Sequence, residues 1–125
     1  MDIYRENILD HYKNPRNFGR LDKPDVSYEA GNPLCGDVIG MEIKKRQMAD
    51  GRWQMVDIKF WGEGCAISQA SASMLTEKVK GMALEDIKIL RYEDIKKMLG
   101  IELSPVRMKC ALLPLEVLQK AIALV

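Results

Sequence analysis

The residues of this sequence best suited to chemistry are three cysteines, Cys35, Cys65 and Cys110. They are odd in number, lie far apart and include no Cys-x-x-Cys pair, which argues against a disulfide framework, a zinc ribbon and a thioredoxin-type redox pair. Three interpretations remain from the residues themselves: buried filler, a reactive thiol, or ligands that the fold brings together. Thiolate sulfur binds soft metals and attacks sulfur, so the last two interpretations carry chemistry.

The residues around the cysteines favour shared ligands over filler. Cys35 lies among the turn residues of 31–37 (GNPLCGD), and Cys65 follows Gly62-Glu63-Gly64. Glycines remove side-chain bulk and leave space for a cluster or for the chain of a partner. Cys65 directly precedes an expected helix, and we expect Cys110 at or just before another. The free N–H groups and the dipole of a helix N-terminus stabilise a thiolate.

Asp37 is the natural fourth ligand, because three thiolates and one carboxylate complete a tetrahedron around zinc or iron. The alternative is a solvated turn aspartate that hydrogen-bonds to its own backbone, and the spacing alone favours neither. His11, the only histidine, is expected to be a packing or surface residue rather than a ligand. Lys109 is a solvated lysine by default, although its ammonium group could stabilise the adjacent Cys110 thiolate.

Periodicity and turn signals predict the elements that position these residues. The expected helices cover residues 3–12, 66–79, 84–90, 92–99 and about 110–125, and the expected strands cover 26–29, 38–45 and 53–61. In the last strand, Val56, Ile58 and Phe60 alternate with the other residues, as in a half-buried strand. Residues 101–109 are expected to be extended because of Ser104-Pro105. This places Pro114 in the first turn of the final helix.

A hairpin places two of the candidate ligands at the same edge. Asp50-Gly51 is a strong turn signal between the strands 38–45 and 53–61. Asp37 precedes the first strand and Cys65 follows the second, so both lie at the end of the hairpin opposite the turn. The order of strands and helices predicts an α+β fold, a small antiparallel β-sheet of about three strands with helices packed on one face.

Composition limits the function classes. The 125 residues are 47% hydrophobic and 30% charged with a formal net charge of +1, an ordinary mixture for one globular domain over residues 1–125. The near-neutral charge gives no reason to expect a nucleic acid or a membrane surface as a partner. No apolar run approaches a membrane span, and the acidic N-terminal residues form no signal core, so a cytoplasmic protein is expected.

Four stretches carry a resemblance to a known family: DHYKNPRNFG (10–19), GNPLCGD (31–37), GEGCAISQASASMLTE (62–77) and SPVRMKCALLPLEVLQKAI (104–122). Through them the sequence resembles the IscU/SufU/NifU-N family of iron–sulfur cluster assembly scaffolds along nearly its whole length. The resemblance implies that Cys35, Cys65 and Cys110 bind the nascent cluster, with Asp37 tuning its lability and able to ligate it. It also implies the fold expected above, with the site at an exposed tip.

The sequence combines features of two branches of this family. Lys109 stands where IscU has a histidine, and the motifs around Cys65 and Cys110 look more like SufU. SufU-type members carry an insertion for which residues 81–100 leave no room. Residues 103–107 (LSPVR) are similar to LPPVK, the IscU motif that a dedicated Hsp70 chaperone reads, but differ at two of five positions. An Hsp70-type chaperone therefore stays open as a partner.

The resemblance implies a scaffold rather than an enzyme. A cysteine desulfurase would deliver sulfur, iron would join it, and a 2Fe-2S cluster would pass to apo iron–sulfur acceptor proteins. The alternative is a zinc-dependent sulfurtransferase, in which zinc is held in the same site and a thiolate accepts the sulfur. The third class is an interaction domain without metal. The missing insertion favours the scaffold; the metal bound on isolation, and the choice between a monomer and a cluster-bridged homodimer, stay open.

Overall fold

The computed structural model describes residues 3–33 and 36–125. The elements follow one another as α1 (Ile3–Lys13), β1 (Val26–Asn32), β2 (Asp37–Gln47), β3 (Trp53–Glu63), α2 (Ala66–Val79), α3 (Leu84–Lys88), α4 (Tyr92–Leu99) and α5 (Pro105–Ala123). All the predicted helices and strands are present, and most bounds agree within a few residues.

The three strands form one antiparallel sheet in the order β1-β2-β3. The hairpin between β2 and β3 turns at Gly51, whose φ of 90° suits the Asp-Gly signal. At the other end of this hairpin Val38 pairs with Glu63, so the start of β2 lies beside the end of β3. The expectation that Asp37 and the segment leading to Cys65 share one edge of the sheet is confirmed.

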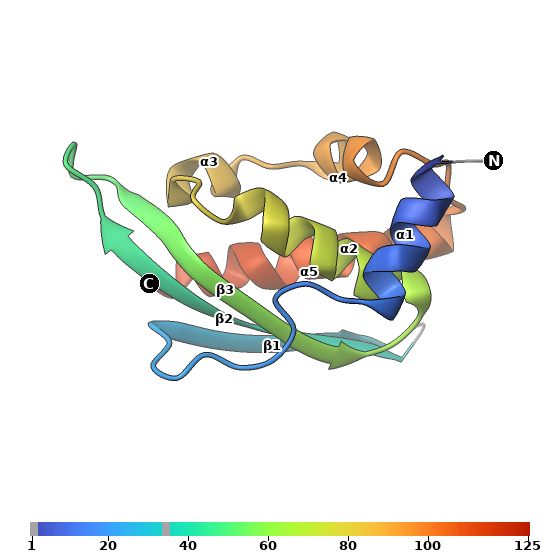
Figure 1. Ribbon diagram of the computed structural model, residues 1–125, viewed down its shortest axis with the longest axis horizontal. Coiled ribbons are helices and arrows are strands. Elements are labelled where there is room, and N and C mark those ends of the chain that lie inside the picture. The colour runs from blue at the N-terminus through green and yellow to red at the C-terminus, as the bar shows by residue number, and fades with distance from the viewer. Residues whose placement is uncertain (1–2, 34–35) are drawn as a thin grey trace.

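The helices cover one face of the sheet, as expected (Figure 1). α5 packs on β1 and β2, α2 packs on β3 and α5, and the remaining helices lie over these two. Residues 70–73 of α2, which alternate alanine and serine, are fully buried, since small side chains allow close packing on several sides. The largest fully buried side chains include Ile39, Met41, Ile43, Ile58, Phe60, Leu75 and Leu118. Within the described ranges, no helix is both long enough and apolar enough to cross a membrane.

The alternation predicted for β3 is wrong at one end of the strand. The pairing with β2 shifts between Lys44 and Lys45, which skips Val56 and produces a β-bulge. A bulge inserts one residue and reverses the facing of the residues beyond it. Val56 is therefore 40% exposed and Met55 is fully buried, whereas the expected alternation holds from Ile58 onwards.

The predicted start of the last helix is also wrong. α5 begins at Pro105, and Ser104 is its N-cap, with a side chain that accepts a hydrogen bond from the Arg107 N–H at 3.3 Å. Proline is well tolerated at the first helical position, where its missing N–H would have had no partner in the helix. Cys110 therefore lies in the second turn, and Pro114 lies inside the helix rather than in its first turn.

Candidate metal centre

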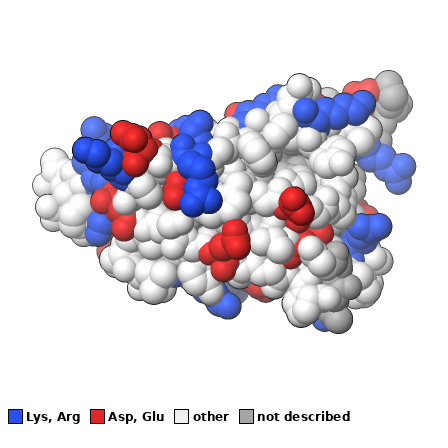
Figure 2. Space-filling view, turned by 90° about the horizontal axis from the view of Figure 1, so that it is seen from below, with Lys and Arg blue, Asp and Glu red and all other residues white. Residues whose placement is uncertain are grey.

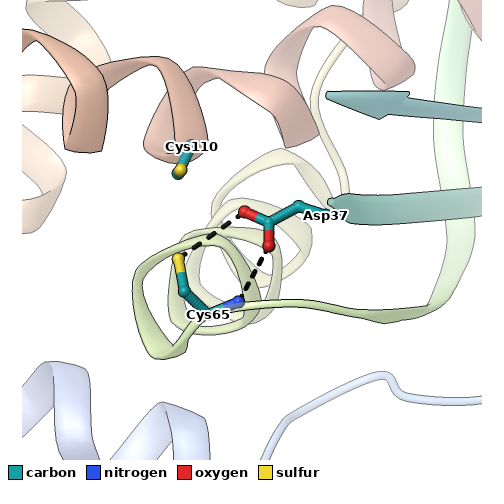
Figure 3. Close-up of side chains that lie close together, drawn as sticks. All are labelled: Asp37, Cys65 and Cys110. Carbon is teal, nitrogen blue, oxygen red and sulfur yellow. Dashed lines mark hydrogen bonds between the residues drawn. The ribbon is translucent and has the colours of Figure 1, made fainter. Parts of the chain in front are cut away.

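Three of the predicted ligands meet at the tip of the sheet (Figure 3). Asp37 is the first residue of β2, Cys65 is the N-cap of α2, and Cys110 lies on α5. One ligand atom from each lies within 4.8 Å of the other two. Two sulfur atoms and one carboxylate oxygen are a donor set that suits zinc or iron.

Asp37 is hydrogen-bonded to Cys65, which follows the other strand of the hairpin. Its Oδ1 accepts a hydrogen bond from the Cys65 N–H at 2.9 Å, and the Cys65 Sγ lies 3.6 Å from its Oδ2. The residue is only 1% exposed, and a buried carboxylate is costly unless it is hydrogen-bonded. Asp37 is therefore not the solvated turn aspartate of the alternative interpretation.

Two glycines allow this close approach. A Cβ on Gly64 would lie 2.2 Å from the Asp37 Oδ1, and a Cβ on Gly62 would lie 2.1 Å from the Val38 carbonyl oxygen. Both glycines have a positive φ, 155° and 153°, that side chains disfavour. The glycines of the GEGC segment therefore make room for the chain that carries Asp37, in addition to any room left for a ligand.

Cys65 is the partly exposed thiol of the group. It directly precedes α2, as predicted, and its Sγ lies 3.9 Å from the hydroxyl oxygen of Ser68. Ser68, fully buried, donates its hydroxyl to the Cys65 carbonyl at 3.1 Å. Ser68 is not among the predicted site residues, although a serine in the first turn after a cysteine N-cap is visible in the sequence.

Cys110 is fully buried, and its setting differs from the predicted one. Because it lies in the second turn of α5, the free N–H groups of a helix start are not beside it. Its position is fixed instead by packing between helices: Ser71 of α2 donates its hydroxyl to the Ala111 carbonyl at 2.7 Å. Pro114 has no N–H to donate to the Cys110 carbonyl, so the regular helix pattern is interrupted beside the thiol.

The other residues considered from the sequence are Cys35, Lys109 and His11. Cys35 lies outside the described residues. Lys109, next to Cys110 on α5, is exposed and lines a hollow with Glu116 and residues 31–33. His11 is a packing residue, as expected: it is 6% exposed, and its Nδ1 lies 2.7 Å from the Ser73 hydroxyl oxygen.

The family comparison agrees with this geometry. The sequence model described as NifU-like N terminal domain matches residues 3–124. The chain belongs to the NifU-like N-terminal domain family. Relatives of this domain include the iron–sulfur cluster assembly scaffold protein IscU of Haemophilus influenzae, 40% identical over 123 residues, which cover 96% of this chain and 93% of the relative. The iron–sulfur cluster assembly enzyme IscU of Drosophila melanogaster is 40% identical over 97% of this chain and 77% of the relative.

SufU is equally similar to this NifU-like domain. The zinc-dependent sulfurtransferase SufU of Bacillus subtilis is 40% identical over 138 residues, covering 97% of this chain and 90% of the relative. A solved structure of an iron–sulfur cluster assembly scaffold protein for the SUF system from Fervidobacterium islandicum has a TM-score of 0.77 and 28% identity, covering 94% of each chain. The predicted family resemblance and the predicted α+β fold are both confirmed.

Proposed function

We propose that this chain is a scaffold on which a 2Fe-2S cluster is assembled from iron and desulfurase-derived sulfur and then passed to apo iron–sulfur acceptor proteins. The observation that supports it most is the group of Asp37, Cys65 and Cys110, whose ligand atoms lie within 4.8 Å of one another in a member of the NifU-like N-terminal domain family. We include Cys35 as a further ligand on sequence grounds, because it precedes Asp37 by two positions.

The chemistry of this proposal requires thiolates. A cysteine desulfurase presents a persulfide, and a thiolate of the scaffold attacks its outer sulfur. The sulfur–sulfur bond of the donor breaks, a new one forms on the scaffold cysteine, and the desulfurase leaves as a thiolate. Two electrons from a thiol or an electron-transfer protein then reduce the outer sulfur to sulfide, the scaffold cysteine returns to a thiolate, and iron joins the sulfide as cargo between the ligands. We propose a reducing compartment such as the cytoplasm, because such thiols must stay reduced.

The second candidate function is zinc-dependent sulfur transfer. It is supported by the 40% identity to the SufU sulfurtransferase and by a ligand set that suits zinc as well as iron. In this case Asp37 and the cysteines would hold zinc, whose positive charge would keep the thiols deprotonated, and one thiolate would accept sulfur.

One feature of the comparisons favours the scaffold. The alignment with SufU runs over 138 residues, which is longer than the 125-residue chain, so SufU has residues that this chain lacks. The alignments with the IscU relatives run over 123 and 124 residues, so they are not longer than this chain. By length this chain therefore matches IscU better than SufU.

Anaerobic assembly tests the proposal. The chain is incubated with ferrous iron, cysteine and a cysteine desulfurase, and absorption and Mössbauer spectra are recorded before apo-ferredoxin is added. We expect a 2Fe-2S spectrum that moves to the ferredoxin, and its loss in Cys35→Ser, Cys65→Ser and Cys110→Ser. No cluster, together with faster desulfurase turnover by the zinc-loaded chain, would establish the sulfurtransferase instead. Size-exclusion chromatography before and after assembly distinguishes a monomer from a cluster-bridged homodimer.

A further inference from the structure

The face of the sheet opposite the helices carries a hollow at the same end as the metal group. It is lined by Glu29 of β1, Val38 of β2, and Trp61, Gly62 and Glu63 of β3. Figure 2 shows the molecule from this side. In the middle of the view, acidic side chains stand among uncharged residues. The hollow adjoins the candidate centre, because Val38 follows Asp37 in β2 and Glu63 lies two residues before Cys65.

One wall of the hollow is a tryptophan that lies over a glycine of the neighbouring strand. Gly40 pairs with Trp61, and a Cβ on Gly40 would lie 2.2 Å from the Trp61 ring, so the indole lies against the bare backbone of β2. The Trp61 Nε1–H donates to the Glu29 Oε2 at 2.7 Å, which fixes the ring across the sheet as far as β1. Val38 is 37% exposed there.

The charge of the hollow is negative. Glu29 and Glu63 stand on its rim, and no lysine or arginine is among the described residues that line it. The guanidinium of Arg20 stacks on the Trp61 ring, 3.7 Å from its centroid. Arg20 also pairs with Glu42, its Nε lying 3.4 Å from Oε2, so its charge is already matched by a carboxylate outside the hollow.

We propose that this hollow is a docking site for an arginine or lysine side chain of the cysteine desulfurase, an inference that rests on the proposed function. The aliphatic stem of such a side chain fits against Val38 and against the part of the Trp61 indole that lines the hollow, since Arg20 already stacks on the ring. Its charged end is attracted by Glu29 and Glu63. Because the hollow adjoins Asp37, a desulfurase anchored there holds its persulfide next to the metal group during sulfur transfer.

Isosteric neutralisation of the rim tests the docking site. The variant E29Q/E63Q removes both charges, and the amide oxygen at position 29 can still accept from the Trp61 indole. The matched control E85Q/E93Q removes two exposed carboxylates from the first turns of α3 and α4. Binding of the desulfurase from the same organism is measured by calorimetry at low and physiological salt, and zinc content and unfolding are measured for every variant.

We expect E29Q/E63Q to raise the Kd for the desulfurase by about tenfold at low salt and to flatten its salt dependence, as loss of complementary rim charges does. The control is expected to stay within about twofold of the wild-type chain, since its charges lie elsewhere. Zinc content should not change in either variant, because none of these residues belongs to the group of Asp37, Cys65 and Cys110.

The chain has two tryptophans, which give a second readout. With fluorotryptophan in the chain, fluorine NMR reports separately on Trp61 in the hollow and on Trp53 at the opposite end of β3. Desulfurase should shift the Trp61 signal more than the Trp53 signal. Equal or absent shifts, with binding intact, would overturn the docking site.

The remaining outcomes distinguish a failure of the docking site from a failure of the proposed function. Wild-type affinity in E29Q/E63Q overturns the docking site while leaving the scaffold proposal in place. If the wild-type chain itself binds no desulfurase and accepts no sulfur, the proposed function fails, and the docking site fails with it. A self-association that weakens in E29Q/E63Q while desulfurase binding stays unchanged would assign the hollow to a second copy of this chain.

Discussion

At the scale of single residues, Asp37 occupies a tightly constrained place in the site. It is 1% exposed, its Oδ1 accepts the Cys65 N–H, and the Cβ position of Gly64 is already filled by its carboxylate. A carboxylate is a hard and weakly held ligand beside soft thiolates on iron. Asp37 therefore suits a role in releasing the cargo as much as in holding it.

We predict that Asp37→Ala still assembles a cluster but releases it more slowly to apo-ferredoxin, because the hard ligand is gone and less negative charge remains at the site. Sulfur acceptance from the desulfurase should continue. The measurement is the cluster half-life with apo-ferredoxin, paired with desulfurase turnover, and Asp22→Ala in the exposed loop serves as the control. A shorter half-life together with lost turnover would favour the zinc sulfurtransferase over the scaffold.

His11 gives a prediction about pH. Burial lowers the pKa of His11 from its usual 6.5, and nearby Arg16 lowers it further, against the opposing effect of Glu77 and Asp10. The unfolded chain therefore binds more protons than the folded chain below pH 6.5, so stability rises with pH there. We expect the contribution of His11 to the free energy of unfolding of the wild-type chain to be fully present above this pH. As the pH decreases below it, the free energy of unfolding should fall.

The variant His11→Gln isolates this effect, since the chain has no other histidine and glutamine can still hydrogen-bond to Ser73. Urea unfolding of both proteins at several pH values between 7.5 and 5 is the measurement. The slope in this range should be smaller in the variant. Identical slopes would mean that His11 titrates equally in the folded and unfolded chain.

At the scale of elements, the site depends on how α2 and α5 pack together. The fully buried hydroxyl of Ser71 joins them by its bond to the Ala111 carbonyl, next to Cys110. We predict that Ser71→Ala lowers the free energy of unfolding by about 1 kcal/mol. Since the bond also orients the backbone beside a ligand, zinc affinity should fall on the order of tenfold.

Urea unfolding and competitive zinc titration measure these two effects, and Ser27→Ala on the exposed side of β1 is the control. A loss of stability without any change in zinc affinity would show that Ser71 stabilises the helix pair but does not position Cys110.

The elements also show what the sequence could predict. The Asp50-Gly51 turn and the flanking periodicity were enough to bring Asp37 and Cys65 to one edge, because a hairpin is a local structure. The start of α5 was missed because Ser104-Pro105 has two uses, as an extended pair and as an N-cap followed by a first-turn proline. The bulge at Val56 depends on how β3 pairs with β2. The sequence of β3 alone therefore could not predict it.

At the scale of the whole molecule, the site joins distant parts of the chain. Its described ligands come from β2, α2 and α5, and no local spacing relates Cys110 to the other two. The prediction that Cys110 belongs to the site rested on its expected place at a helix start and on the family resemblance, whereas its actual position is set by the packing of α5 on the sheet and on α2. A metal held by all three ligands would therefore link three elements of the fold.

We therefore predict that zinc stabilises the whole domain. At a free zinc concentration 100 times the Kd, the gain is about 2.7 kcal/mol, because the unfolded chain does not hold these ligands together. The measurement is the thermal midpoint with zinc and with a chelator. Cys65→Ser should abolish most of the difference, and an equal zinc effect in that variant would place the metal elsewhere.

The placement of Cys110 on α5 has a consequence for the newly made protein. α5 is synthesised after all the other described elements, and its thiol reaches Asp37 and Cys65 only when the helix has docked on the sheet. A nascent or misfolded chain thus offers at most a partial set of ligands to the metal. Cargo loading would in this way act as a checkpoint that only chains with a completed fold can pass.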